Sequence, residues 1–405
     1  MRAAWPSLLL LLLAARRSSV VATGSGVGRP VDRVVGRWSA PPVKVPSDSV
    51  VDGPLLGNGN FAAVLSSDVG APATSGSAPP SRGEMRFHCG MNDFFAAPTN
   101  GFSSCGYPDL DGSNKPGMKQ VGGVTLVAPA LGAGSLVAPL SFSADQRPAN
   151  GTVTVTLRGG KVELRVRSWV HATEPLLMLD LVLISDDPRM RSLELSIEAW
   201  SVLGCGLGPN PLVEDSFLPV KTGLSGGGPR NRTLWVTRQN GFEYQQQDGV
   251  YNLTTAAVAV RLLGPSGFAA AAAGQRCTRA SASQHYGADY LPCAVGNFTL
   301  HAGAQNGATI AAAVLSDRQL GWQGDLVESA TARLQNLGAD GQRKLSATAA
   351  PTATALAQLE RTHAAWWEKY WNASWVSWPS SPVVEKMWCA GEPLPVFVFE
   401  CICFV

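Results

Sequence analysis

The segment from Thr152 to Val170 alternates apolar and polar residues on both sides of a glycine pair. The first arm reads TVTVTLR, Gly159-Gly160 follows, and the second arm reads KVELRVRSWV. Such alternation places successive side chains on opposite faces of a strand, and a glycine pair between two alternating runs is typical of a hairpin turn. The segment is therefore predicted to be a β-hairpin, which restricts the chain to folds that contain an antiparallel sheet.

Several other segments also have strand character. The runs LLMLDLVLI and SLELSIEAWSV follow the hairpin, and further strands are predicted at 232–238, 255–262, 297–302 and 308–315. Asn58-Gly59 lies between two apolar runs, which predicts a second hairpin with a type I′ turn. The 43 glycines and 28 prolines indicate many turns, and segments 70–83 and 204–230 are predicted to be loops.

The period of the apolar residues changes at about Asp325. DLVESATARLQNL and ALAQLERTHAAWWEKYW both have helical spacing. Many strands followed by helices predict a mainly β protein, a large antiparallel β-sandwich (supersandwich) followed by a C-terminal helical linker.

The N-terminus has the pattern of a secretory signal peptide, which we place at 1–22. Arg2 precedes an apolar run from Leu8 to Ala15, which is too short to span a membrane. Five N-glycosylation sequons follow, at Asn150, Asn231, Asn252, Asn297 and Asn372. The protein is therefore expected to be secreted or extracellular and to carry N-glycans, with Asn372 the least used because it lies in a predicted helix.

Eight cysteines are too few for a disulfide framework in a chain of this length. The closest pairs along the sequence are Cys89 with Cys105 and Cys277 with Cys293, each closing a loop of about fifteen residues. No CxxC spacing occurs, so no zinc site, and no other metal or cofactor, is predicted.

The charge pattern gives no support for a nucleic-acid partner, because the net charge is +2 and only 15% of residues are charged. Gly57-Asn58-Gly59 lacks the Lys-Ser/Thr of a phosphate loop. Asp109, Asp111 and Ser113 have the opening spacing of a calcium loop, but the residues that follow do not complete an EF-hand. His88, beside Cys89, is interpreted as a packed core histidine.

Five of the twelve tryptophans lie between Thr362 and Trp378. Trp367, Trp371, Trp375 and Trp378 recur at i, i+4, i+8 and i+11, which is one face of a helix. This spacing favours a packed helix over a wet surface patch or a platform for stacking sugar rings.

Five segments occur in an order that resembles a known family: PLLGNGNFAAVL, MNDFF at 91–95, VGGVTL at 121–126, SWVHATEPLLMLDL at 168–181 and THAAWWEKYWNASWV at 362–376. They resemble the N-terminal β-sandwich and linker of glycoside hydrolases related to family 95, which are fucosidase-like and galactosidase-like enzymes with an (α/α)6 catalytic barrel. Asn60-Phe61 stands where the family has Arg-Leu, and Tyr370 stands where it has Phe. The resemblance implies that the aromatic helix packs at the junction between sandwich and barrel.

The resemblance also divides the chain into parts. Together with the signal peptide at 1–22, it implies a sandwich domain at 45–318, a helical linker at 325–388 and an aberrant apolar tail at 389–405. A natural C-terminal strand or apolar tail is the alternative for the last segment. The family's catalytic residues lie in its barrel, so no position of this chain inherits a catalytic role.

The expected function is the sandwich portion of a secreted glycoside hydrolase that acts on carbohydrate, without catalysis by this chain alone. The alternative is a stand-alone carbohydrate-binding or cell-surface interaction module. Asn92 and Asp93 are the candidate substrate-binding residues, with a turn or capping role as the alternative. No membrane span is expected, and the sequence sets no oligomeric state.

Overall fold

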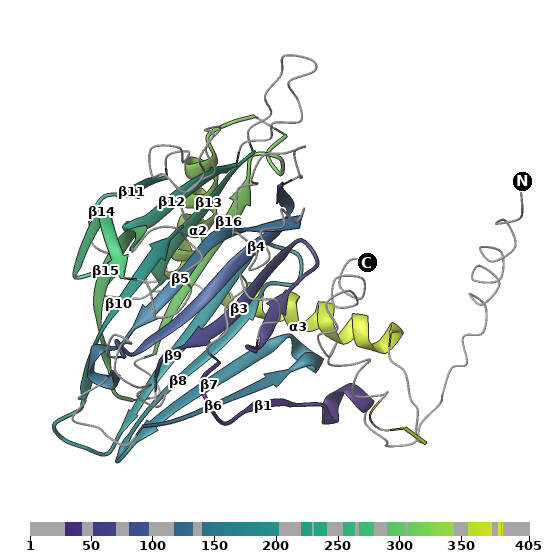
Figure 1. Cartoon of the computed structure of the whole chain (residues 1–405), viewed down its shortest axis with the longest axis vertical. Coiled ribbons are helices and arrows are strands. Elements are labelled where there is room, and N and C mark those ends of the chain that lie inside the picture. The colour runs from purple at the N-terminus through teal and green to yellow at the C-terminus, as the bar shows by residue number, and fades with distance from the viewer. Residues whose placement is uncertain are drawn as a thin grey trace, which may run out of the picture.

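The computed structural model describes residues 29–42, 52–69, 81–96, 117–132, 140–201, 220–228, 231–240, 254–263, 267–278, 290–303, 307–321, 323–343, 355–374, 380–381 and 383. Within these residues sixteen strands form two antiparallel sheets (Figure 1). Two α-helices, α2 (Leu326–Arg343) and α3 (Ala355–Ala373), follow the last strand. The predicted mainly β sandwich with a C-terminal helical segment is confirmed.

The larger sheet contains nine of the described strands. Their spatial order is β1 (Gly36–Trp38), β6 (Leu140–Arg147), β7 (Thr152–Gly159), β8 (Val162–Val170), β9 (Leu176–Ser185), β16 (Ala308–Ser316), β13 (Thr254–Leu263), β12 (Thr233–Asn240) and β11 (Lys221–Ser225).

The second sheet contains the other seven described strands. Their order is β14 (Ala270–Thr278), β15 (Tyr290–His301), β10 (Ser192–Trp200), β5 (Gly117–Val127), β4 (Glu84–Ala96), β3 (Phe61–Ser67) and β2 (Leu55–Gly57). Short 3₁₀-helices occur at η1 (Pro30–Arg33), η2 (Pro129–Leu131) and η3 (Pro148–Asn150).

The main hydrophobic core contains buried side chains from both sheets. Val155 and Leu164 of the larger sheet and Phe87 and Leu126 of the smaller one belong to the same cluster, each with 1% or less of its surface exposed. Burying an aliphatic or aromatic side chain of this kind stabilises a fold by about 1.5–3 kcal/mol. The alternating register of β7 with β8, from Thr152↔Trp169 to Gly159↔Val162, confirms the predicted hairpin.

The hairpin between β2 and β3 is also present, although its turn differs from the prediction. The backbone N–H of Asn58 donates to the carbonyl of Phe61 at 3.0 Å, so the enclosed pair is Gly59-Asn60 rather than Asn58-Gly59. Gly59 has a φ of 85°, which only glycine adopts without strain. The side chain of Asn58 also stabilises this turn, because its Oδ1 accepts hydrogen bonds from the backbone N–H groups of Asn60 and Phe61.

The strand predictions were incomplete. The segment 204–230 was predicted to be a loop throughout, yet β11 occupies Lys221–Ser225 and pairs with β12. The segment 70–83 is described only from residue 81, where no regular structure occurs. Asp109, Asp111 and Ser113, whose spacing matches only the opening of a calcium loop, lie outside the described residues.

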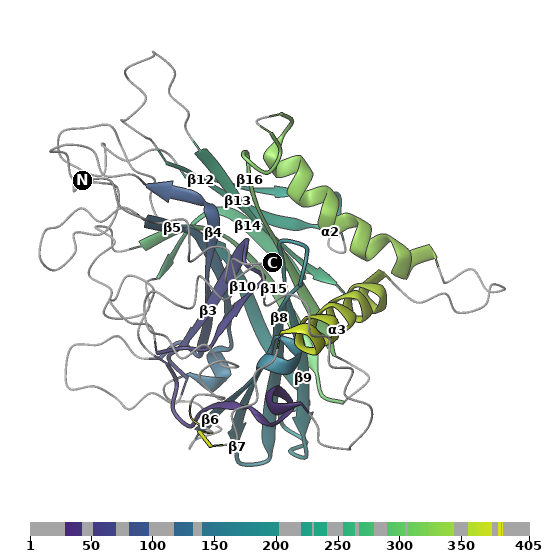
Figure 2. The ribbon, with the colours of Figure 1, turned by 90° about the vertical axis from the view of Figure 1, so that its right-hand side faces the viewer.

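Both predicted helices are present on the same side of the molecule (Figure 2). Helix α2 covers the outer face of the larger sheet, where Ala330 and Leu334 pack with Trp169, Met178 and Ala313. The domain boundaries remain a prediction, although strands run from Gly36 to Ser316.

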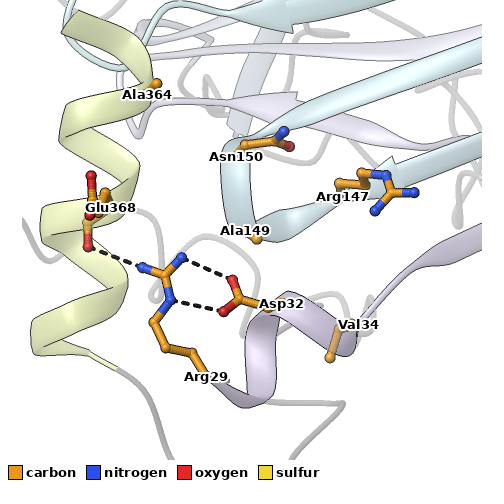
Figure 3. A pocket seen from close by; sticks show the side chains of 8 residues that line it. All are labelled: Arg29, Asp32, Val34, Arg147, Ala149, Asn150, Ala364 and Glu368. Carbon is orange, nitrogen blue, oxygen red and sulfur yellow. Dashed lines mark hydrogen bonds and ion pairs between the residues drawn. The ribbon is translucent and has the colours of Figure 1, made fainter. Parts of the chain in front are cut away.

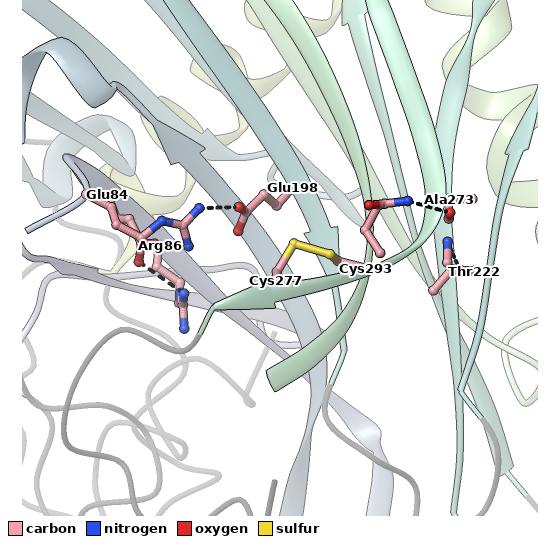
Figure 4. Close-up of a disulfide and its surroundings, with 10 residues drawn as sticks. Glu84, Arg86, Glu198, Thr222, Ala273, Cys277 and Cys293 are labelled. Carbon is pink, nitrogen blue, oxygen red and sulfur yellow. Dashed lines mark hydrogen bonds and ion pairs between the residues drawn. A yellow bond between two sulfur atoms is a disulfide. The ribbon is translucent and has the colours of Figure 1, made fainter. Parts of the chain in front are cut away.

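The two cysteine pairs that are closest along the sequence differ in the structure. Cys277 and Cys293 are bonded and link β14 to β15 (Figure 4). Cys89 is a buried free thiol, so the other pair that is close in sequence, Cys89 with Cys105, is not bonded in this structure. Cys89 lies on β4 and belongs to the main core between the sheets, where burial raises the pKa of its thiol to about 12. Cys105 itself lies outside the described residues.

Candidate functional site

Asn58 ties two distant loops together. Its side-chain Nδ2 donates to the backbone carbonyls of His171 at 2.8 Å and Glu174 at 3.1 Å. Because its Oδ1 already holds the β2–β3 turn, all the hydrogen-bonding groups of the amide are engaged. The glycine motif and the HATEP segment, which are 113 residues apart at Asn58 and His171, therefore meet in space.

The loop from His171 to Glu174 also contacts both helices. His171 Nε2 lies 3.1 Å from the hydroxyl of Thr362 on α3, and Arg333 of α2 forms a 2.6 Å ion pair with Glu174. The backbone N–H groups of Thr173 and Glu174 donate to His171 Nδ1, so this nitrogen is the acceptor and Nε2 carries the proton. Burial lowers the pKa of His171, which keeps the ring in this neutral form.

The predicted substrate-binding pair lies at the other side of the same hairpin. Asn92 is exposed, its backbone N–H donates to Asn60, and its Nδ2 lies 3.4 Å from the carbonyl of Gly59. Asp93 is half-buried, and its Oδ2 accepts a 2.5 Å hydrogen bond from Ser316 on the opposite sheet. Its Oδ1 is enclosed and has no hydrogen-bond partner among the described residues. Both residues lie where the pairing of β4 with β5 is irregular.

We call these contacts the motif edge, defined as residues 58–60, 92–93, 171–174 and 362. It runs continuously from β4, through the β2–β3 turn, to the start of β9 and helix α3. Hydrogen bonds of 2.8–3.4 Å link these segments to one another, and the edge carries polar groups. Glu174 is half-exposed and Asn92 is exposed, so both are accessible to a polar ligand.

Two carboxyl groups facing one another are the usual requirement of a glycosidase. Asp93 is engaged by Ser316 and Glu174 by Arg333. Glu360 forms an ion pair with Arg167 at 2.5 Å. Among the described residues, the motif edge therefore presents no two carboxyl groups that are both free of a partner.

The aromatic helix α3 packs against the turn between β6 and β7. Trp371 is buried, and its indole N–H donates to the carbonyl of Pro148 at 2.9 Å. Trp371, Trp367 and Tyr370 form a cluster with Val31 and Val34 of the N-terminal segment. The packed-helix interpretation is confirmed for Trp367 and Trp371, whereas Trp375 and Trp378 lie outside the described residues.

His363 connects α3 to the same turn. Its Nε2 lies 2.8 Å from the backbone carbonyl of Asn150 and therefore donates the proton. The ring also packs 4.7 Å from that of Trp169. Burial lowers the pKa of His363 to about 4, so the imidazole stays neutral in the folded protein.

A second polar cluster lies on the smaller sheet, near the disulfide. Arg82 forms ion pairs with Glu84 at 2.6 Å and with Glu198 at 2.8 Å, and Arg86 lies 3.1 Å from Glu84 (Figure 4). Burial raises the pKa of Glu84 to about 7, and the two arginines oppose this shift only in part. No described contact joins this cluster to the motif edge.

His88 has the structural role that the sequence predicted. It is buried on β4, with Nε2 at 2.9 Å from the Ser66 hydroxyl and Nδ1 at 2.8 Å from the Gln120 side-chain amide. Its ring meets Trp200 edge-on at 5.5 Å. Burial lowers its pKa well below the ordinary value.

Four of the five sequons fall on described residues. Asn150, Asn231, Asn297 and Asn372 are all exposed. Asn297 lies within β15 and Asn372 within α3, and Asn252 lies outside the described residues. Whether any of them carries a glycan remains a prediction.

Two further observations limit the kinds of site that the described part can hold. Among the residues that the structure describes, no helix is both long enough and apolar enough to cross a membrane. Across the same ranges, no three or more His, Cys, Asp or Glu side chains come together in a way that could hold a metal ion.

Comparison with known proteins gives no family assignment. Neither a protein-family profile nor a curated sequence matches the chain. Among solved structures, it is similar to a protein assigned as a kojibiose phosphorylase from the human microbiome, with 11% identity and a TM-score of 0.47. That similarity covers 88% of this chain and 41% of the other.

Two other solved structures show weaker similarity. A bacterial glucoamylase in complex with acarbose has 8% identity and a TM-score of 0.33, over 83% of this chain and 40% of the other. A family GH92 α-mannosidase of Bacteroides thetaiotaomicron has 10% identity and a TM-score of 0.28, over 91% and 41%. The chain thus spans about two fifths of the length of these proteins. Similarities with TM-scores below 0.5 assign no activity to this chain, and none of these three proteins is described as a member of family 95.

Sequence reasoning missed several residues of the motif edge and the α2 residue that pairs with it. Asn58 was interpreted only as a turn residue, and Thr362 and Arg333 were not singled out. Their partners lie on segments that are 113 to 191 residues away along the chain. No local pattern encodes such pairs, although the family resemblance did include the segments that contain Asn58, His171 and Thr362.

Proposed function

We propose that this chain is the sandwich portion of a secreted glycoside-hydrolase-type protein, and that its motif edge contacts carbohydrate. The observation that carries the proposal is the bridge from Asn58 to His171 and Glu174, together with the contact of His171 with Thr362. Three segments that resemble family 95 in sequence are thereby joined in space. A chance resemblance of short segments gives no reason for them to meet.

The chemistry of the motif edge suits a sugar. Asn92 presents an exposed amide, and Glu174 and Arg333 present a half-exposed ion pair. These groups can exchange hydrogen bonds with hydroxyl groups, and the turn and loop that carry Asn92 and Glu174 are linked by hydrogen bonds, which reduces the ordering needed on binding. In this proposal bond cleavage is the task of residues outside the motif edge, because its carboxylates are already paired.

The test is to separate binding from hydrolysis. The purified 405-residue chain is titrated with fucosyl and galactosyl oligosaccharides by ligand-observed NMR, and the same mixtures are examined for hydrolysis products by chromatography. We expect saturable binding without hydrolysis. Binding should weaken in Asn92→Ala, whereas Gln275→Ala, which removes an exposed amide on β14 at the opposite edge of the smaller sheet from β2, serves as the control.

Two results would contradict the proposal. Absence of binding to every oligosaccharide would remove the carbohydrate role of the motif edge. Sustained hydrolysis that a single carboxylate substitution in this chain abolishes would show that the chain is itself a catalyst.

A further inference from the structure

A cavity of about 360 Å³ lies between η1, the β6–β7 turn and helix α3. Figure 3 shows six of its residues that matter here: Arg29, Asp32, Arg147, Asn150, Ala364 and Glu368. Its volume falls in the range of about 300–1,000 Å³ that is typical of sites for small molecules. None of the residues that line this cavity belongs to the motif edge.

The charges around the cavity favour a neutral ligand with many hydrogen-bonding groups. Two arginines and two acidic side chains line it, so their formal charges cancel. Arg29 is fixed by Asp32 at 2.9 Å and by the carbonyl of Glu368 at 3.4 Å. The Arg147 guanidinium and the Glu368 carboxylate make no hydrogen bond or ion pair with another described residue. They can therefore bind hydroxyl and acetamido groups.

Asn150 lies in the wall of this cavity and begins the sequon Asn150-Gly151-Thr152. Its Oδ1 accepts a 2.7 Å hydrogen bond from the Thr152 hydroxyl, and its backbone carbonyl is held by His363. These two contacts fix Asn150, whereas its Nδ2 forms no hydrogen bond with another residue that the structure describes. This nitrogen is the atom to which an N-linked sugar is attached.

We propose that Asn150 carries an N-linked glycan whose first sugar occupies this cavity and connects η1, η3 and α3. The donor is a lipid-diphosphate-linked oligosaccharide. A bond forms between Asn150 Nδ2 and the anomeric carbon, the bond from that carbon to the diphosphate breaks, and the diphosphate leaves with the electron pair. The amide loses one proton to a base of the transferase. Glycan addition precedes folding, so the cavity forms around the sugar.

The experiment compares two glycans in the same molecule. The full chain is secreted from a eukaryotic host, and glycopeptide mass spectrometry gives the occupancy of Asn150 and of exposed Asn231. The native protein is then treated with peptide:N-glycosidase, and release is followed at both sites. We expect both sites to be occupied and release at Asn150 to be about tenfold slower, because the enclosed sugar is reached only after local opening.

Variants test whether the cavity is the cause of the slow release of the glycan at Asn150. Thr152→Val should abolish occupancy at Asn150, whereas Thr152→Ser should retain it. Ala364→Trp should fill the cavity and make release at Asn150 as fast as at Asn231. Ala365→Trp, on the next residue of α3 and also exposed, should leave the slow release unchanged.

Several outcomes would overturn the inference. These are an unmodified Asn150 beside an occupied Asn231, equal release at both sites, or slow release that persists in Ala364→Trp. Absence of glycan at both asparagines would overturn it together with the expectation of N-glycosylation. None of these results bears on carbohydrate binding by the motif edge, so the two proposals fail separately.

Discussion

The carboxylate of Asp93 joins the two sheets through the hydroxyl of Ser316. The 2.5 Å hydrogen bond links β4 of the smaller sheet to the last residue of β16 in the larger one. Ser316 is fully buried, so neither partner can exchange this contact for water without moving. Asp93 therefore supports the position of the neighbouring Asn92 in addition to any contact with a ligand.

A double-mutant cycle measures this link. Asp93→Ala and Ser316→Ala should each lower the free energy of unfolding, with a coupling energy of about 1.5–3 kcal/mol, as is usual for a hydrogen bond to a charged group. Urea denaturation gives the four free energies. If the effects of the two substitutions simply add, the contact does not hold the sheets together.

Asn58 should be the most sensitive position of the motif edge. Asn58→Ala removes the bonds to His171 and Glu174 and to the turn, so we expect a loss of about 2–3 kcal/mol in the free energy of unfolding. Asn60→Ala keeps the backbone contacts of the turn and should change stability by less than about 0.5 kcal/mol. Equal denaturation midpoints for the two variants would contradict the bridging role.

Gly151 and Gly160 form a matched pair. Both have a left-handed backbone, with φ of 59° and 54°, but an added Cβ at Gly151 would lie 2.5 Å from Trp367 Nε1, whereas Gly160 has open space. Gly160→Ala should lower the free energy of unfolding by about 1 kcal/mol, from backbone strain alone. Gly151→Ala should lower it by a further 1–3 kcal/mol, roughly, because α3 must shift. Thermal denaturation of both variants checks the difference.

His363 makes stability depend on pH. Its folded pKa of about 4 lies below its unfolded value near 6.5, so the unfolded chain binds more protons between these limits. Above about pH 6.5 the titration of His363 does not lower the free energy of unfolding. As the pH falls from about 6.5 to about 4, that free energy decreases by a total of about 1–3 kcal/mol.

A substitution isolates this contribution. His363→Gln keeps a donor for the Asn150 carbonyl but does not titrate, so its stability should fall less steeply over the same pH range. The groups that influence His363 are His171, Arg167 and Glu360, and none is altered. Parallel stability curves for parent and variant would contradict the assignment.

The strands that the sequence predicts are those with one buried face and a visible period of two, such as β7, β8 and β10. Strand β4 was not predicted because Glu84, Arg86 and His88 are buried on its outer face. The polar residues of this strand therefore do not indicate a face that is exposed to solvent. Strand β14 was missed because its alanine- and glycine-rich sequence shows no alternation. Such strands are specified by long-range pairing rather than by local pattern.

The candidate site was less predictable than the fold for the same reason. The pattern of Asn58-Gly59 predicts a turn, and nothing near it in sequence indicates the loop at His171 that receives its amide. The spacing of the tryptophans predicts the buried face of α3, because a helical period is local. The turn at Pro148 against which this face packs is a tertiary contact, 223 residues away at Trp371.

The contact of Gly151 with Trp367 has a consequence for engineering this protein. Gly151 is the middle residue of a sequon, a position where glycosylation tolerates any residue except proline. Here that freedom is absent, because the indole occupies the space of a side chain. The two requirements are nevertheless separable along the chain. The side chains of Asn150 and Thr152 define the sequon, whereas the missing side chain of Gly151 leaves space for Trp367 of α3, so the sequon can be removed at Thr152 without filling that space.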